Sequence, residues 1–252
     1  MRKPLIAGNW KLNMTIAQSL ELVNTLKSQL SEINNVDIVV APVFTSLNCV
    51  AEFLKGSNIA VSAQNCYPEN KGAFTGEVSP DIIKDVGCRY SIVGHSERRQ
   101  LFRESDIFIN KKVRSLLAKE LITILCVGET LAEREMNEMY NVIERQVTFG
   151  LHGVSPSDMR NVVVAYEPVW AIGTGKTASK KQAEEVHAFI RRTLTDKFND
   201  EIANETRIIY GGSVKPDNID ELMDQPNIDG TLVGGASLNS ADFCRIVNFQ
   251  RI

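Results

Sequence analysis

The chain has 252 residues, of which 43% are hydrophobic and 23% are charged, and its net charge is −3. This composition is typical of a globular protein and argues against a disordered chain. The small negative charge argues against a nucleic-acid-binding protein, which usually carries a basic excess. A chain of this length could form two small domains or one large α/β barrel.

Neither a membrane segment nor a metal site is expected from the sequence. The chain has no apolar run of about 18 residues, the length that a membrane-spanning helix needs. The five cysteines are odd in number and form no C-x-x-C pair, and the three histidines form no metal-binding spacing. We therefore expect reduced thiols and a cytoplasmic protein that binds no metal, with Cys126 serving in packing.

Short segments rich in β-branched residues recur along the whole chain. Several of them, such as 38–40 and 162–164, are apolar on both faces, which is typical of strands in a parallel sheet. The predicted strands are 4–9, 36–41, 59–64, 89–93, 121–127, 161–166, 206–210 and 230–233.

Helical patterns lie between these strands. Apolar residues recur at steps of three and four over 16–30, 109–117, 136–147 and 183–194. Helix starts are predicted by the Thr130–Glu133 and Ser179–Gln182 capping boxes and by Pro80 after Ser79. The third, seventh and eighth helices are predicted from short segments only.

Eight βα units with no linker between them predict a single-domain (β/α)8 barrel that spans residues 1–252. An open, doubly wound sheet is the alternative, because it also alternates strand and helix. In both architectures, ligands bind beyond the carboxyl ends of the strands. The residues that follow each strand are therefore the candidates for function.

Among the ionisable residues that follow predicted strands, Lys11, His95 and Glu167 are candidates for chemistry. Glu167 taken alone fits a solvated loop carboxylate better than a general base. Lys11 could be a surface lysine or a positive charge facing an anionic substrate. His95 could be a structural histidine, but Ser96 could cap a helix there, and a helix N-terminus favours a neutral imidazole that could donate a hydrogen bond to a substrate.

Glycine-rich turns follow the last two strands. The segments 211–213 and 234–235 expose backbone N–H groups that could bind phosphate, although tight turns alone would also explain them. The segment 168–177 has stiff ends and a small, glycine-containing tip, which is typical of a mobile lid. A static long loop is the alternative.

Three familiar motifs are incomplete in this chain. A Walker A loop ending at 173–177 would need glycine where Trp170 stands. The dinucleotide-like pattern over 173–178 does not directly follow its strand, because 167–172 intervene. A nucleophile elbow over 94–98 would need glycine in place of Arg98.

The strand-end motifs together resemble the triosephosphate isomerase family. The matching blocks run in order from residue 5 to about 240, namely 7–13, 93–99, 126–130, 165–175, 210–213 and 232–238. The resemblance implies a cofactor-free isomerase of glycolysis and gluconeogenesis. Such an enzyme interconverts dihydroxyacetone phosphate and D-glyceraldehyde 3-phosphate through an enediol(ate) intermediate.

The resemblance also implies residue roles and an assembly. Glu167 corresponds to the base and His95 to the neutral electrophile, Asn9 and Lys11 to partners of the substrate oxygens, and Glu97 to a supporting acid near Lys11. The phosphate contacts that it implies are Gly173, Ser213, Gly234 and Gly235. The family is usually a homodimer, and the segment that enters the partner corresponds to residues 65–79.

Two rival functions remain open at this point. A Schiff-base aldolase would need a lysine at a strand end, and Lys11 stands at one, but the pair of Glu167 and His95 suits proton transfer better. A nucleotide-binding protein built on 173–176 is the rival from another class. Borohydride trapping and calorimetry with ATP or NAD would distinguish these two from an isomerase.

Overall fold

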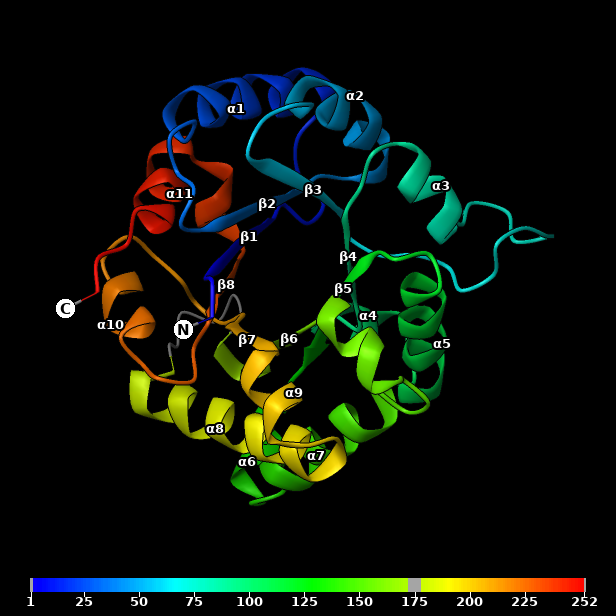
Figure 1. Cartoon of the computed structure of the whole chain (residues 1–252), viewed down its shortest axis with the longest axis vertical. Helices are drawn as coiled ribbons and strands as arrows, with labels where there is room; N and C mark the ends of the chain where they lie inside the picture. Colours follow the sequence, from blue (N-terminus) through cyan, green and yellow to red (C-terminus); the bar gives the residue numbers. More distant parts are fainter. Residues whose placement is uncertain (1, 172–177, 252) are drawn as a thin grey trace.

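The computed structural model of the protein describes residues 2–171 and 178–251. Eight parallel strands form a closed barrel in sequence order, and the last strand pairs with the first (Figure 1). The strands are β1 (Leu5–Asn9), β2 (Asp37–Ala41), β3 (Ile59–Ala63), β4 (Tyr90–Val93), β5 (Ile122–Val127), β6 (Val162–Tyr166), β7 (Arg207–Tyr210) and β8 (Gly230–Val233). The barrel prediction is confirmed, and the open sheet is wrong.

The strands are apolar on both faces because both faces are buried. In β2, Val39 faces the barrel interior, whereas Ile38 and Val40 pack in the layer beneath the helices. In β6, Val163 faces inward and Val164 outward. This arrangement accounts for the continuous apolar runs, and each predicted strand lies within one residue of its observed ends.

Helices surround the barrel between successive strands (Figure 1). The α-helices are α1 (Ile16–Gln29), α2 (Phe44–Leu54), α3 (Pro80–Asp85), α4 (Ser96–Leu101), α5 (Asp106–Leu117), α6 (Leu131–Glu135), α7 (Met139–Gly150), α8 (Lys180–Lys197), α9 (Asp200–Glu205), α10 (Ile219–Met223) and α11 (Ser240–Val247). The 3-10 segments are η1 (Pro156–Asn161), η2 (Val169–Ala171) and η3 (Gly235–Leu238). No described helix has the length and apolar character needed to cross a membrane.

Three predicted helix starts are confirmed. Thr130 and Ser179 each form a reciprocal capping box with the residue three positions later, at the start of α6 and α8. Ser79 caps α3, whose first residue is Pro80. Each cap satisfies backbone N–H groups that a helix start leaves without a partner.

One predicted helix is wrong: the pattern over 136–147 spans two helices. Met136 is the C-cap of α6, and Asn137 follows with a φ of 59°. The N–H of Asn137 donates to Arg134 and that of Glu138 to Glu133, which is a Schellman motif. The left-handed residue therefore ends α6 and turns the chain before α7 begins.

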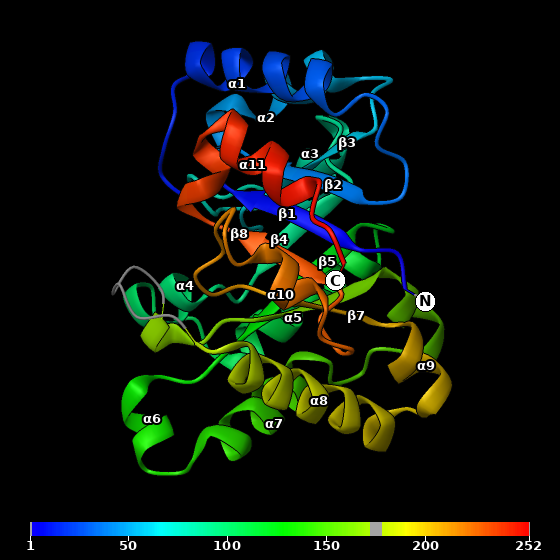
Figure 2. The same ribbon diagram turned by 90° about the vertical axis from the view of Figure 1, so that its left-hand side faces the viewer.

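All eight strands run in one direction, so their carboxyl ends share one end of the barrel. In Figure 2, β1 starts near the N-terminus on the right and runs toward the left, where the carboxyl ends lie. The residues that follow the strands are thereby brought together from distant parts of the sequence.

Candidate active site

A cavity of about 660 Å³ opens at the carboxyl ends of the strands. Seven predicted site residues line it: Asn9, Lys11, His95, Glu167, Ser213, Gly234 and Gly235. Glu97 stands beside them, in contact with Lys11. Gly173 lies outside the described residues.

Glu167 is held at the end of β6 with its side chain in the cavity. Its backbone N–H donates to Val127 at 2.8 Å, which continues the pairing of β5 with β6. One carboxylate oxygen, Oε2, accepts the N–H of Ser96 at 2.9 Å. The residue is only 1% exposed, so the alternative of a solvated loop carboxylate is wrong.

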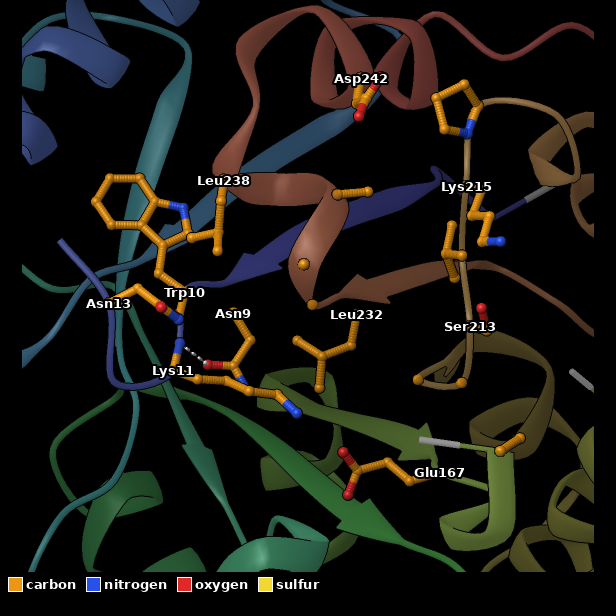
Figure 3. Close-up of a pocket in the computed structure, with 18 of the residues that line it drawn as sticks. Asn9, Trp10, Lys11, Asn13, Glu167, Ser213, Lys215, Leu232, Leu238 and Asp242 are labelled. Carbon is orange, nitrogen blue, oxygen red and sulfur yellow. Dashed lines mark hydrogen bonds between the residues drawn. The ribbon is translucent and has the colours of Figure 1, made fainter. Parts of the chain in front are cut away.

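The second carboxylate oxygen of Glu167 is less fully paired than the first. Oε1 lies 2.8 Å from Nε2 of His95, yet it accepts no well-directed hydrogen bond from the described part of the chain. In Figure 3 the carboxylate points across the cavity toward the amine of Lys11. Glu167 therefore presents to the cavity a buried oxygen that could accept a hydrogen bond or a proton from a ligand.

The charge of Glu167 is stabilised despite its burial. Burial alone would raise the pKa of this carboxyl, but the neighbouring His95, the Ser96 N–H and Lys11 outweigh it. The pKa of Glu167 is consequently below its usual range. The group is a carboxylate at neutral pH, as a general base must be.

His95 caps α4 with its own ring, a role that the sequence predicts for Ser96. The N–H of Glu97 donates to Nδ1 of His95 at 3.3 Å, and Ser96 is instead the first residue of the helix. The imidazole takes the capping position because its acceptor nitrogen replaces a serine oxygen. A neutral ring that accepts at Nδ1 carries its proton on Nε2.

Two opposing influences act on His95. Burial lowers its pKa, but the charges of Glu167 and Glu97 outweigh burial and raise the pKa above its usual value. When Glu167 takes up a proton, the largest of the raising influences disappears. Burial and the helix start then favour the neutral imidazole.

Lys11 reaches the cavity from a left-handed backbone conformation, with a φ of 53°. Asn9 Oδ1 accepts the Lys11 N–H at 3.1 Å, and the Gln64 amide donates to the Lys11 carbonyl at 2.8 Å. The ammonium lies 2.6 Å from Glu97. Sequence reasoning missed Gln64, because an amide just after a strand carries no motif.

The glycine-rich turns after β7 and β8 also line the cavity, and Figure 3 labels Ser213 of the first turn. Ser213 follows β7, and Gly234 leads into η3, whose Ser237 donates to the Gly234 carbonyl at 2.6 Å. An added Cβ at Gly235 would meet no atom within 4 Å. The backbone of this turn is therefore open to a ligand.

The start of the predicted lid segment is held by Glu129, two residues after the end of β5. The N–H of Val169 donates to the Glu129 carbonyl at 3.1 Å, and the Trp170 indole donates to the Glu129 carboxylate at 2.8 Å. Tyr166 and Arg134 contact the same carboxylate oxygen. Residues 172–177 of this segment lie outside the described residues.

Neither a reactive thiol nor a metal-binding cluster accompanies these groups in the described structure. Cys126 is fully buried in the barrel interior, and burial raises the pKa of its thiol well above the usual value. A thiol in this state is a packing group rather than a nucleophile. Within residues 2–171 and 178–251, no three His, Cys, Asp or Glu side chains are grouped so that they could hold a metal ion.

Comparison with known proteins gives one family over the whole chain. The triosephosphate isomerase family model matches residues 4–250. The triosephosphate isomerase of Syntrophotalea carbinolica is 60% identical over 252 residues, which is 100% of both chains. Those of Pelobacter propionicus and Chloroflexus aurantiacus are 55% and 53% identical over 250 residues, or 99% of this chain and 100% of theirs.

The motifs at the strand ends, the closed barrel and these matches agree. The reaction of this family is the isomerisation of a three-carbon sugar phosphate, a step of glycolysis and gluconeogenesis. The chain belongs to the triosephosphate isomerase family and interconverts dihydroxyacetone phosphate and glyceraldehyde 3-phosphate.

Proposed function

We propose that Glu167 moves the proton in this isomerisation and that His95 polarises the substrate carbonyl. One observation carries the proposal: the buried Oε1 of Glu167 lies 2.8 Å from Nε2 of His95 and accepts no well-directed hydrogen bond from the described residues. A base and a hydrogen-bond donor thus stand side by side in one cavity. The reaction needs both groups within reach of two adjacent carbons.

The proton transfer conserves all atoms of the substrate. Oε1 of Glu167 removes a proton from the hydroxymethyl carbon of dihydroxyacetone phosphate, and the electron pair moves to the carbonyl oxygen to give an enediolate. The carboxylic acid then returns the proton to the neighbouring carbon, which becomes the chiral centre of glyceraldehyde 3-phosphate. The hydroxyl proton of the first carbon moves to the oxygen of the second through His95, whose Nε2 gives its proton to that oxygen and regains one from the hydroxyl, so that the first carbon becomes the aldehyde. The lowered pKa of Glu167 keeps the resting group ionised.

His95 stabilises the enediolate by donating a hydrogen bond from Nε2. The Glu97 N–H occupies Nδ1, so the proton of the neutral ring is on the nitrogen that faces the cavity. A neutral donor matches the weak acidity of an enediol more closely than an imidazolium does. This family is a well-known case of a neutral histidine acting as the electrophile, and here the same tautomer follows from the contacts of His95.

Lys11 and Asn9 complete the part of the cavity that binds the substrate oxygens. The Lys11 ammonium offsets the charge that develops on the enediolate and the charge of the phosphate. Glu97 holds that ammonium at 2.6 Å and so fixes its position in the cavity. Asn9 holds the backbone of Lys11 and lines the same wall.

The phosphate binds to the turns after β7 and β8. Ser213, Gly234 and Gly235 offer backbone N–H groups at the place where barrels of this type bind phosphate. We assign a further contact to Gly173, which belongs to the lid segment 168–177. Closure of that segment excludes water and prevents loss of phosphate from the enediolate.

The segment 65–79 forms the interface of a homodimer in this proposal. It extends away from the barrel between β3 and α3 (Figure 1), and Phe74 on it is 40% exposed. An aromatic ring is costly to leave in water, so burial of Phe74 against a second copy of the chain would stabilise a dimer. The free thiols at all five cysteines fit a cytoplasmic location.

A coupled assay with glyceraldehyde 3-phosphate and no added metal tests the roles. We expect Glu167→Gln to lower kcat by about 10²- to 10⁴-fold, because glutamine cannot accept the proton. Activity of that variant within tenfold of the parent would remove Glu167 as the base. A covalent adduct at Lys11 after borohydride treatment with substrate would favour an aldolase mechanism instead.

A further inference from the structure

A buried amide on α7 clamps the end of β5. Gln146 lies on the inner face of this helix and is only 5% exposed. Its Oε1 accepts the Gly128 N–H at 2.8 Å, and its Nε2 donates to the Gly128 carbonyl at 3.1 Å. One side chain thereby satisfies both backbone polar groups of a residue at which the strand has ended.

Gly128 in turn packs against the backbone of Glu167. A Cβ built on Gly128 would lie 1.8 Å from the Glu167 carbonyl oxygen, so only glycine allows this approach. The preceding residue, Val127, accepts the Glu167 N–H at 2.8 Å. The position of Gly128 therefore decides where the backbone of Glu167 can lie.

A second glycine confines the side chain of Glu167 from the other side. A Cβ on Gly211 would lie 2.8 Å from Cγ of Glu167, and the Gly211 N–H donates to Tyr166 at 2.7 Å. Glu167 is thus seated between the ends of β5 and β7. In the wall formed by the end of β5, Gly128 is itself held by Gln146, a side chain from outside the barrel.

We propose that Gln146 is a positioning residue that places the Glu167 carboxylate, acting through Gly128. This inference rests on the proposed role of Glu167 as the base. A buried amide costs free energy unless its polar groups are paired. Here both hydrogen bonds of the Gln146 amide go to Gly128, which packs against the backbone of the base. Displacement of a catalytic group by about 1 Å can cost about 10²-fold in rate.

Gln146→Met tests the proposal, because methionine keeps the length of the side chain but cannot form either hydrogen bond. We expect kcat to fall by about 10- to 100-fold, while inhibition by inorganic phosphate is unchanged. The phosphate turns follow β7 and β8 and do not touch Gln146. The matched control is Asn110→Leu, because Asn110 on α5 is also a buried amide that binds two backbone carbonyls, those of Gly150 and His152 at the C-terminal end of α7.

Gln146→Glu provides a second readout. Burial raises the pKa of a carboxyl, and the protonated acid can accept from and donate to Gly128 as the amide does. We therefore expect the ratio of the kcat of this variant to that of the parent to fall as pH rises. A constant ratio would contradict the clamp even if Gln146→Met fails to fold.

Other outcomes also overturn the inference. One is a kcat of Gln146→Met equal to that of Asn110→Leu. Another is a loss of kcat, phosphate inhibition and folded fraction in the same proportion, which would show a purely structural role. Glu167→Gln is measured in the same assay to distinguish the two proposals. If that variant retained activity, the role of Glu167 as the base would be refuted, independently of the results for Gln146.

Discussion

The position of His95 at the start of α4 determines its tautomer, its burial and the direction of its Nε2. Nδ1 accepts the Glu97 N–H, the ring is buried, and Nε2 faces both the cavity and Glu167. Capping the helix with the imidazole ties the tautomer to the backbone. The same ring therefore cannot rotate without leaving a helix N–H without its partner.

This geometry predicts the result of His95→Gln. Glutamine can donate a hydrogen bond, but it does not hold that donor rigidly at the helix start. We expect kcat to fall by about 10²- to 10³-fold, as for loss of one preorganised donor to a developing oxyanion. Inhibition by inorganic phosphate should change much less. A variant altered only in its affinity for substrate or phosphate would argue against the electrophile role.

At the residue scale, the sequence predicted seven of the residues that line the cavity but not the residues that support them. Lys11, His95 and Glu167 could be found because each follows a strand, and strand ends meet in a parallel fold. Gln64 and Gln146 could not be found in this way. Their contacts join residues far apart in the sequence, and a lone glutamine has no distinguishing pattern.

At the element scale, the strands were predictable because burial on both faces leaves a continuous apolar signal. The boundary between α6 and α7 was not, because apolar spacing continues from Met136 into Tyr140 while the backbone reverses at Asn137. Apolar periodicity describes which face a residue occupies and carries no information about the φ of one residue. The asparagine itself was the available signal, since it tolerates the left-handed conformation.

The capping box of α8 leads to a prediction at this scale. Ser179 accepts the Gln182 N–H, and Gln182 accepts the Ser179 N–H in return. Ser179→Ala removes one of these bonds from the start of an 18-residue helix. We expect a loss of about 0.5–2 kcal/mol in the free energy of unfolding, measured by urea denaturation at fixed protein concentration.

Thr25→Ala is the matched control for that measurement. Thr25 lies half-buried in the middle of α1, where its hydroxyl donates to the Glu21 carbonyl four residues earlier. Alanine is the better helix former at such a position, so stability should be equal or slightly higher. If Ser179→Ala is no more harmful than Thr25→Ala, the cap contributes nothing measurable to the fold.

At the scale of the whole molecule, stability should depend on pH through His187. This ring is fully buried, contacts Tyr166 and Tyr210, and lies near the charge of Arg191. Burial is the main cause that lowers its pKa from 6.5 to about 3. The unfolded chain binds a proton at a higher pH than the folded chain does, so this contribution is complete above pH 6.5 and is lost as the pH falls toward 3.

The expected slope is about 1.4 kcal/mol in the free energy of unfolding for each pH unit below the unfolded pKa of His187. Urea denaturation of the parent and of His187→Gln between about pH 6.5 and about pH 4.5 measures it. The free energy of unfolding of the variant should change less with pH over this window than that of the parent, because the variant lacks the one proton that His187 takes up on unfolding. This holds whatever the stability of the variant at the upper pH. Parallel curves would show that the buried ring does not govern acid stability.

The assembly is the last property that belongs to the whole molecule. Apolar side chains stand exposed on the segments that follow β1, β2, β3 and β4: Leu12 is 94% exposed, Phe44 40%, Phe74 40% and Phe102 64%. Burial of these side chains against a second copy of the chain would remove apolar area from water and so favour association. Leu12 is also the neighbour of Lys11, so burial of this surface by a partner would constrain the left-handed backbone that carries the ammonium.

Sedimentation of Phe74→Glu tests this assembly together with its link to activity. A buried, unpaired carboxylate opposes association, so we expect the parent to sediment as a dimer and the variant as a species near the 28.0 kDa of one chain, with lower kcat. Phe149→Glu is the control, because Phe149 is 50% exposed on α7, away from the segment 65–79. A parent that is monomeric and fully active would refute the dimer, and a monomeric Phe74→Glu with full kcat would separate assembly from the placement of Lys11.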